Sequence, residues 1–314
     1  MPFPFLDAEG SPIWEHVMKS TEHKFHFLST NVYQSSKYGG GVYSANHLVY
    51  EMDYKGFGLF VNISPSFGNG INKKIEERGF SSLPTADDLE RDVKDINEKG
   101  REYLLEAFVK LSHRNAELIA GLVDATAFFD TNNFANDEVA QFMNTDLVNN
   151  PLSLLPSYNL GMILNFNYGI FRFSAAAIEG EPDTETVYLL EGGISEEDYN
   201  LSLHYFHDSS DEIKGVGISG DYSLGNLGFF FRYGTNSSDE YEYFISGGIV
   251  YNLGKHTVGV GVAHRKGDES EDVNVGEVYY KYNLLDNLHL TLDYQYIDEI
   301  EDTYAIGMRL HFEY

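Results

Sequence analysis

Apolar and aromatic residues occupy every second position at the C-terminal end of this chain, and no other feature limits the possible folds so strongly. From Leu288 to Tyr296 the even-numbered residues are Leu or Tyr, and the residues between them are polar. After an acidic turn at 298–302, the even-numbered residues from Tyr304 to Tyr314 are again apolar or aromatic. Side chains of a strand alternate between two faces, so the pattern predicts a hairpin with one apolar and one polar face.

The same rhythm recurs along the chain and predicts sixteen strands. The predicted strands lie near residues 24–34, 43–54, 57–65, 102–112, 115–124, 158–166, 168–178, 185–194, 198–207, 214–223, 226–234, 241–252, 255–265, 275–284, 287–297 and 303–314. Each is close to the roughly 9–11 residues that a tilted membrane strand needs. An even number of antiparallel strands brings both ends of a closed barrel to the same side.

Two kinds of connection alternate strictly between the predicted strands, after a Gly-rich turn at 39–41. The short ones are Lys55-Gly56, His113-Arg114-Asn115, Asn165-Phe166-Asn167, Ser195-Glu196-Glu197, Gly225-Asn226, Gly254-Lys255 and Asp286-Asn287. The longer ones, mostly acidic, span 179–185, 208–212, 235–240, 266–274 and 298–302. Short periplasmic turns and long outer loops are typical of outer-membrane barrels. We therefore predict an all-β, sixteen-stranded antiparallel transmembrane β-barrel, with a soluble β-sandwich or propeller as the alternative.

Composition excludes several classes of protein. The 314 residues carry 49 acidic and 21 basic side chains, and a chain this negative has nothing to offset phosphate repulsion, so nucleic acid is excluded as a general partner. Without cysteine there is neither a disulfide nor a thiolate metal site. No apolar run reaches the length of a transmembrane helix. The N-terminus does not read as a signal peptide, so the protein is either cytosolic or has had its signal peptide removed. The predicted barrel favours the second reading, in a bacterial outer membrane.

Residues 1–23 are predicted to be an N-terminal periplasmic segment, and residues 24–314 a single barrel domain. If the apolar face meets lipid, four basic side chains point into the lumen. They are Arg172, Arg232, Lys281 and Arg309. A charge facing lipid at the midplane would cost about 2–4 kcal/mol, which favours the inward orientation. Small inward residues such as Gly259 and Gly261 are expected to keep the lumen open.

The stretch from Gly121 to Glu138 contains a Gly-x-x-Asp strand end, the Phe128-Phe129 pair and a polar loop. With 141–144 and 149–151 it resembles the carbohydrate-selective porin family of the OprB type. Residues 87–97 and 103–106 also resemble that family's second outer loop and following strand. The resemblance covers about 85–165 and implies a sixteen-stranded pore for sugars, constricted by loops that fold inward. This chain is shorter than typical members, mainly because its later loops are short.

Two polar interruptions, 66–101 and 125–157, are therefore expected to form the constriction. A sugar needs polar groups for its hydroxyls and aromatic rings for its C–H faces, and the second interruption supplies both. Its candidate pore-lining residues are Asp124, Phe128, Phe129, Asp130, Asn132, Asn133, Asp137 and Glu138. Expected partners are outer-membrane lipid and lipopolysaccharide, small sugars or ions, and further copies of the chain in a homotrimer. The C-terminal Phe312 and Tyr314 resemble the signal that barrel-assembly machinery recognises.

Other functions stay open at this point. The acidic outer loops would attract cations, so a general cation-preferring porin is the first alternative. An outer-membrane barrel enzyme or adhesin is the second, but the candidate histidines, His204, His264 and His289, are scattered and lack a clear nucleophile. We predict neither a catalytic residue, nor a metal site, nor a cofactor. Selection would depend on size and on weak contacts along the pore.

Overall fold

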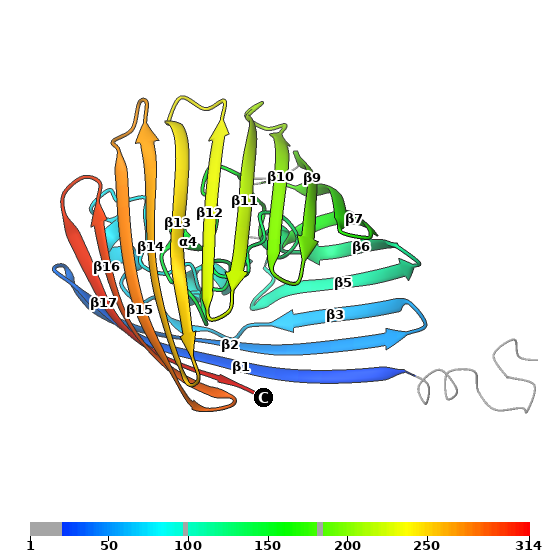
Figure 1. The fold of residues 1–314 in the computed structure, drawn as a ribbon, viewed down its shortest axis with the longest axis horizontal. Coiled ribbons are helices and arrows are strands. Elements are labelled where there is room, and N and C mark those ends of the chain that lie inside the picture. Colours follow the sequence, from blue (N-terminus) through cyan, green and yellow to red (C-terminus); the bar gives the residue numbers. More distant parts are fainter. Residues whose placement is uncertain (1–20, 97–99, 181–184) are drawn as a thin grey trace, which may run out of the picture.

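The chain forms one continuous antiparallel sheet, described by a computed structural model for residues 21–96, 100–180 and 185–314. Its strands are β1 (Glu22–Ser36), β2 (Gly39–Tyr54), β3 (Phe57–Ile63), β4 (Phe67–Gly68), β5 (Leu104–His113), β6 (Ala116–Val123), β7 (Asn159–Tyr168), β8 (Phe171–Glu179), β9 (Thr186–Glu196), β10 (Tyr199–Asp208), β11 (Lys214–Leu224), β12 (Leu227–Asn236), β13 (Tyr241–Leu253), β14 (His256–Gly267), β15 (Val273–Leu285), β16 (Leu288–Asp298) and β17 (Thr303–Glu313). Figure 1 shows them tilted around a common interior.

The sheet closes on itself. β1 pairs with β2 along one edge and with β17 along the other, from Leu28 opposite Glu313 to Ser36 opposite Ala305. The two-residue β4 pairs only with β2, so the other sixteen of the seventeen strands form the wall. The predicted sixteen-stranded antiparallel barrel is confirmed. Closure leaves no free strand edge, which is the only way a sheet satisfies all its backbone groups in lipid.

The predicted strands all exist, and the differences lie at their ends. The predicted N-terminal segment 1–23 lies mostly outside the described residues, and its last two residues begin β1. The Gly-rich stretch 39–41 is the start of β2 rather than a turn, and the turn is Lys37-Tyr38. Asn165-Phe166-Asn167 lies within β7, and the turn follows at 169–170. Glycine and asparagine suggested turns there, but pairing with neighbouring strands extends both segments.

Two-residue connections join the strands at one end of the barrel, which we call the short-turn end. Both Lys55 and Gly56 have positive φ, and Gly225 and Gly254 supply the same backbone conformation in later turns. Such turns match the twist of antiparallel strands. The connections at the opposite, long-loop end are longer except for Lys37-Tyr38, so the predicted strict alternation fails at that first hairpin.

The outer face of the barrel is apolar, as the alternation predicts, and the inner face combines polar side chains with apolar ones that pack in buried clusters. On β7, for example, Leu160, Met162 and Leu164 are exposed outward, while Ile163 between them is fully buried. The described residues contain no helix both long and apolar enough to cross a membrane.

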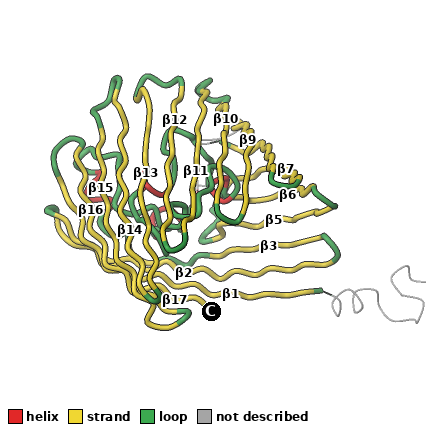
Figure 2. The backbone as a smooth tube through the Cα atoms, in the orientation of Figure 1, coloured by secondary structure: helices red, strands yellow, loops and turns green. Residues whose placement is uncertain are grey.

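Two long segments leave the wall and enter the barrel. The first insert (residues 64–96 and 100–103) follows β3, and the second insert (residues 124–158) follows β6. Their helices are short: α2 (Asn72–Glu76), α3 (Glu90–Val93), the 3-10 turn η2 (Ala125–Ala127) and α4 (Thr145–Val148). Figures 1 and 2 show these helices and loops enclosed behind strands β11 to β14. Apolar side chains of both inserts pack with inward residues of β12–β17 in one core.

Candidate functional site: the barrel lumen

Buried ion pairs hold the second insert against the wall. Arg232 Nε of β12 lies 3.0 Å from Asp130 Oδ2, and neither side chain has any exposed surface. Arg265 Nε of β14 donates to Asp146 Oδ2 at 2.8 Å. The Glu277 carboxylate of β15 accepts the backbone N–H groups of Met143 and Asn144 at 2.7 and 2.9 Å. A buried charge needs a partner and hydrogen bonds, so these contacts fix the insert in place.

The four basic residues predicted to line the pore have different surroundings. Arg309 Nη1 and Nη2 donate to the backbone oxygens of Glu138 and Gln141 at 2.6 and 2.9 Å, and its side chain is fully buried. Lys281 Nζ donates to the Ala140 oxygen at 3.0 Å and is half-buried. Arg172 stays exposed inside the barrel near the short-turn end. Arg232 and Arg309 point inward as expected, but the insert covers them, so they anchor it instead of facing a passing solute.

Among the candidate residues of the second insert, some are likewise buried against the wall and others are exposed. Asn132 is buried and donates to the Gly220 oxygen at 3.1 Å, while the exposed Asn133 donates to Asp221. Phe129 is fully buried in an apolar cluster with the β6–β10 wall. Asp137 accepts the N–H groups of the two residues that follow Glu138, and both carboxylates are half-buried.

The inward glycines do not keep the lumen open, contrary to the prediction. A Cβ on Gly261 would meet the Phe142 ring at 2.9 Å, and one on Gly228 would meet the Phe134 ring at 2.2 Å. A Cβ on Gly259 would strike Tyr279 of the neighbouring strand at 2.1 Å. These positions lack side chains because side chains of the insert or of the wall fill the space.

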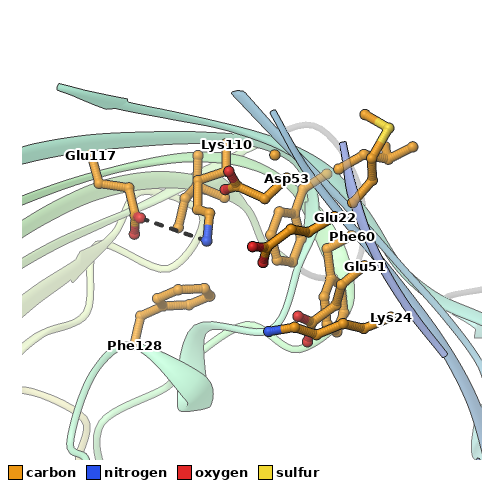
Figure 3. A pocket seen from close by; sticks show the side chains of 13 residues that line it. Glu22, Lys24, Glu51, Asp53, Phe60, Lys110, Glu117 and Phe128 are labelled. Atoms are coloured by element: carbon orange, nitrogen blue, oxygen red, sulfur yellow. Dashed lines mark ion pairs between the residues drawn. The ribbon is translucent and has the colours of Figure 1, made fainter. Parts of the chain in front are cut away.

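An open cavity of about 330 Å³ remains at the short-turn end, between the second insert and the β1–β6 wall. We call it the vestibule. Its charged lining residues are Glu22, Lys24, Glu51, Asp53, Lys110 and Glu117, and its aromatic ones are Phe60, Phe108 and Phe128 (Figure 3). The Phe60 and Phe108 rings stack with centroids 4.7 Å apart, and Phe128 meets Phe108 edge-on at 6.4 Å. Lys110 Nζ lies 3.9 Å from Glu117 Oε2. The vestibule therefore offers ring faces beside charged groups of both signs.

Side chains from three strands and both inserts meet deeper in the barrel. Asn62 of β3 donates to Glu106 Oε2 of β5 at 3.3 Å, and its Oδ1 lies 3.3 Å from His47 Nδ1 of β2. His47 Nε2 lies 3.7 Å from Asp88 Oδ2, and the Tyr158 hydroxyl donates to Asp88 Oδ1 at 2.9 Å. We call these five residues the constriction network, because they join the wall to the two segments predicted to form the constriction. Asn62 and Asp88 are less than one-tenth exposed.

Several carboxyl groups on the inserts have raised pKa values. Burial raises the pKa of Asp88 well above its usual range, and the nearby Asp87 charge adds to the effect. Burial also raises the pKa of Glu138, reinforced by Asp87 and Asp137. Burial raises the pKa of Asp124, although hydrogen bonds from Thr126 oppose the shift. In each case burial is the largest cause, because it disfavours the charged form of a carboxyl group.

One arrangement resembles a catalytic triad but lacks its geometry. Ser153 Oγ lies 2.7 Å from His204 Nε2, and His204 Nδ1 lies 3.9 Å from Glu191 Oε2. The second distance is too long for a hydrogen bond. Ser153 and His204 are each only 1% exposed, so a substrate has no access to the hydroxyl. This group is one more attachment of the second insert to the wall. Among the described residues, no three His, Asp or Glu side chains are arranged to hold a metal ion.

Sequence reasoning missed the constriction network and most of the vestibule. The signal was present, because His47, Glu51 and Asp53 share the inward parity of β2, and Glu106 and Lys110 share that of β5. The inward basic residues predicted from alternation all lie on β8 or later strands. Applied to β1–β6, alternation would have placed the same inward polar residues.

No protein-family model matches the chain. It is 53% identical over 306 residues to a protein of Aquifex aeolicus strain VF5 described as uncharacterized, and the match covers 97% of this chain and 99% of the relative.

Solved structures show the same fold at low sequence identity. A triple mutant of the Rhodopseudomonas blastica porin has a TM-score of 0.67 and 10% identity, over 93% of this chain and all of that one. A loop-deletion mutant of OmpT, an outer membrane protein of Vibrio cholerae, has a TM-score of 0.66 and 11% identity, over 94% of this chain and all of that one. The barrel is therefore a porin fold. These matches do not show the specificity implied by the resemblance to the OprB type.

Proposed function

The chain belongs to the same family as the Aquifex aeolicus protein, and we propose that it is an outer-membrane channel for the passive diffusion of small polar solutes, carbohydrates above all. Its fold, its apolar outer face and its lumen support a channel more than an enzyme. The second insert narrows the lumen, and the solute passes through the vestibule, between the insert and the β1–β6 wall.

The outer surface supports the membrane location. Large apolar side chains are exposed on nearly every strand, for example Phe171 and Phe173 on β8 and Val260 and Val262 on β14. Soluble monomers rarely expose contiguous apolar patches beyond a few hundred Å², whereas lipid-facing strands do so throughout. The two-residue turns then lie in the periplasm and the acidic long loops outside. Recognition of Phe312 and Tyr314 by assembly machinery stays part of this proposal.

The vestibule is the observation that best supports a carbohydrate as the solute. Stacked Phe60 and Phe108, with Phe128 beside them, present ring surface to the C–H faces of a sugar. Glu51, Lys110 and the other charged groups around the rings can exchange hydrogen bonds with hydroxyls. Weak contacts at several positions let a solute enter and leave.

A cation-preferring pore is the second candidate, and the carboxylates favour it. Four of the six charged vestibule residues are acidic, and the constriction network adds Asp88 and Glu106. A neutral sugar passes such a lining without repulsion, while an anion does not. The two candidates therefore differ in what binds, not in what is excluded.

Planar-bilayer recording separates these readings. We expect conductance steps that a neutral disaccharide partly blocks, and Phe108→Ala is expected to weaken the block by roughly 2–10-fold, as lost ring contacts of about 0.5–1.5 kcal/mol imply. Phe57→Ala, an outward ring on neighbouring β3, is the control and should leave the block unchanged. Absence of conductance would overturn the channel. Conductance that no sugar affects, with a strong cation preference under a KCl gradient, would favour the second candidate.

A further inference from the structure

One row of inward residues across β1, β2, β3 and β5 places a carboxylate beside aromatic rings in the vestibule. Strand pairing sets Glu51 opposite Lys24 on one side and opposite Phe60 on the other, and it sets Phe60 opposite Phe108. Neighbouring strands lie about 4.8 Å apart, so adjacent side chains in the row are immediate neighbours. We call these four residues the ring row. Figure 3 shows Lys24, Glu51 and Phe60 together on one side of the vestibule.

The stacking of the two rings leaves one face of Phe60 free, on the side of Glu51. The ring centroids of Phe60 and Phe108 are 4.7 Å apart, and the ring planes are 12° from parallel. This spacing matches the distance between neighbouring strands, so the rings stand across the row and one face of Phe60 covers Phe108. The opposite face of Phe60 therefore looks along the row toward the Glu51 carboxylate.

The vestibule has more carboxylates than its own cations can pair. In the next row toward the short-turn end, Glu22 lies opposite Asp53, so two like charges face each other. Within the described part of the chain, these two carboxylates and the side chains of Lys24 and Glu51 have neither a hydrogen bond nor an ion pair. The remaining two charged lining residues pair with each other. Three carboxylates against one ammonium group leave an excess of two negative charges for a solute to meet.

We propose that the vestibule binds amino sugars, with the protonated amine between Glu51 and the free face of Phe60. This inference rests on the channel proposed above and names its preferred solute. An ammonium group gains from a carboxylate and from the face of an aromatic ring, while the C–H face of the sugar covers the rest of the ring. A neutral sugar uses the ring but leaves the excess carboxylates without a cation. A bare metal ion fits less well, because the described residues contain no three His, Asp or Glu side chains arranged to hold one.

Lys24 limits how tightly an amine binds. It lies opposite Glu51, so its ammonium group competes with the solute for the same carboxylate. Weak binding of this kind suits a channel, because a solute that enters must also leave.

Block of the single-channel current by a matched pair of disaccharides tests the inference. The probes are the β-1,4 disaccharide of glucosamine and cellobiose, which has hydroxyl groups in place of the amines. The concentration for half-block is extrapolated to zero voltage, so that the field across the bilayer does not favour the charged probe. For the wild type we expect half-block at a roughly 3–10-fold lower concentration of the amino sugar, in the range that a cation–ring contact beside a carboxylate gives.

Three variants locate this preference. Glu51→Gln should bring the two half-block concentrations close together, and Lys24→Met should move them further apart because the competing ammonium group is gone. Glu197→Gln removes an exposed carboxylate from a turn at the same end of the barrel, outside the vestibule, and should leave the ratio unchanged. An equal fall of the ratio in Glu51→Gln and Glu197→Gln would overturn the site, because the preference would then come from the overall charge of that end. An unchanged ratio in Lys24→Met, which keeps every carboxylate of the vestibule, would overturn it as well.

Conductance and block report on different proposals. A wild type without conductance would overturn the channel and this inference with it. A conducting wild type that both disaccharides block equally would overturn the amino-sugar site alone. Conductance of Glu51→Gln shows that this variant is folded and inserted, so a lost preference is distinguishable from a lost barrel.

Discussion

Two parts of the barrel wall use inward charge in opposite ways. On β12–β17, Arg232, Arg309 and Glu277 are buried beneath the second insert and bind its backbone and carboxylates. On β1–β6, Lys24 and Glu51 sit opposite each other and face the vestibule. The same alternating pattern produces both sets. Whether an inward charge anchors a loop or meets a solute depends on which part of the wall the insert covers.

The difference between the two parts of the wall also explains why part of the lumen stays open. Apolar packing and buried ion pairs bind both inserts to the β12–β17 side, where they share one core, and smaller apolar clusters bind them to β1, β2 and β5–β10. The opposite side retains the open vestibule and the constriction network. The contacts that bind the inserts to the wall are therefore as necessary for an open lumen as the residues that line it, because an insert released from the wall would block the lumen.

Removing an anchor should have the largest effect. Arg232→Met leaves Asp130 charged and buried, and breaking a buried pair in this way costs about 3–5 kcal/mol. Urea denaturation in detergent micelles would measure the loss, and bilayer recording should show a less uniform conductance. Arg172→Met, exposed in the same lumen, is the control and should change stability by less than about 0.5 kcal/mol. Adding Asp130→Leu to Arg232→Met should recover most of the loss. If Arg232→Met matches the wild type, the anchor role is wrong.

Filling a glycine site beneath the insert should have a smaller effect. Gly228→Val places carbon atoms where the Phe134 ring lies, and overpacking of this kind costs about 1–3 kcal/mol. Gly276→Val, with open space around the new side chain, should be nearly neutral. Equal losses in the two variants would contradict close packing of the insert at β12.

The constriction network should make ion selectivity depend on pH. The raised pKa of Asp88 means that the folded chain takes up this proton at a higher pH than the unfolded chain does. Lowering the pH through that raised pKa removes a carboxylate charge, so the cation preference should fall. Stability linked to Asp88 should rise at the same time, because the folded state binds the extra proton, and it is lost again as the pH rises through the folded pKa.

Reversal potentials in a KCl gradient, measured from pH 8 to pH 4, would follow this change. Asp88→Asn should remove part of the pH dependence while leaving the pore open. A cation preference that stays constant over this range in the wild type would contradict a role of the network in permeation.

The smallest effect is expected at the vestibule. Lys110 and Glu117 are partly exposed and 3.9 Å apart, and surface pairs of this kind contribute roughly 0–1 kcal/mol. Lys110→Gln should therefore leave the urea midpoint nearly unchanged while it alters the block by a sugar. A large loss of stability would show that the two walls do not differ as described.

Much of the barrel could be predicted from local pattern alone. The two-residue period that runs from Leu288 to Tyr314 defines the strands and their two faces, and it does so for all sixteen wall strands. The errors lie where turn-forming residues occur inside strands, at 39–41 and 165–167. Pairing with neighbours decides those positions, and a single segment does not contain that information.

The site was predictable only in part. Arg232 and Asp130 were both selected from the sequence, but their contact joins residues that no local pattern relates. Alternation says that Arg232 points inward and cannot say whether the lumen or an insert meets it there. The sequence by itself determined a barrel with inward charge, because strand periodicity is local. Only the tertiary structure decided which inward charges are buried, because that depends on where two irregular inserts find complementary charge and space.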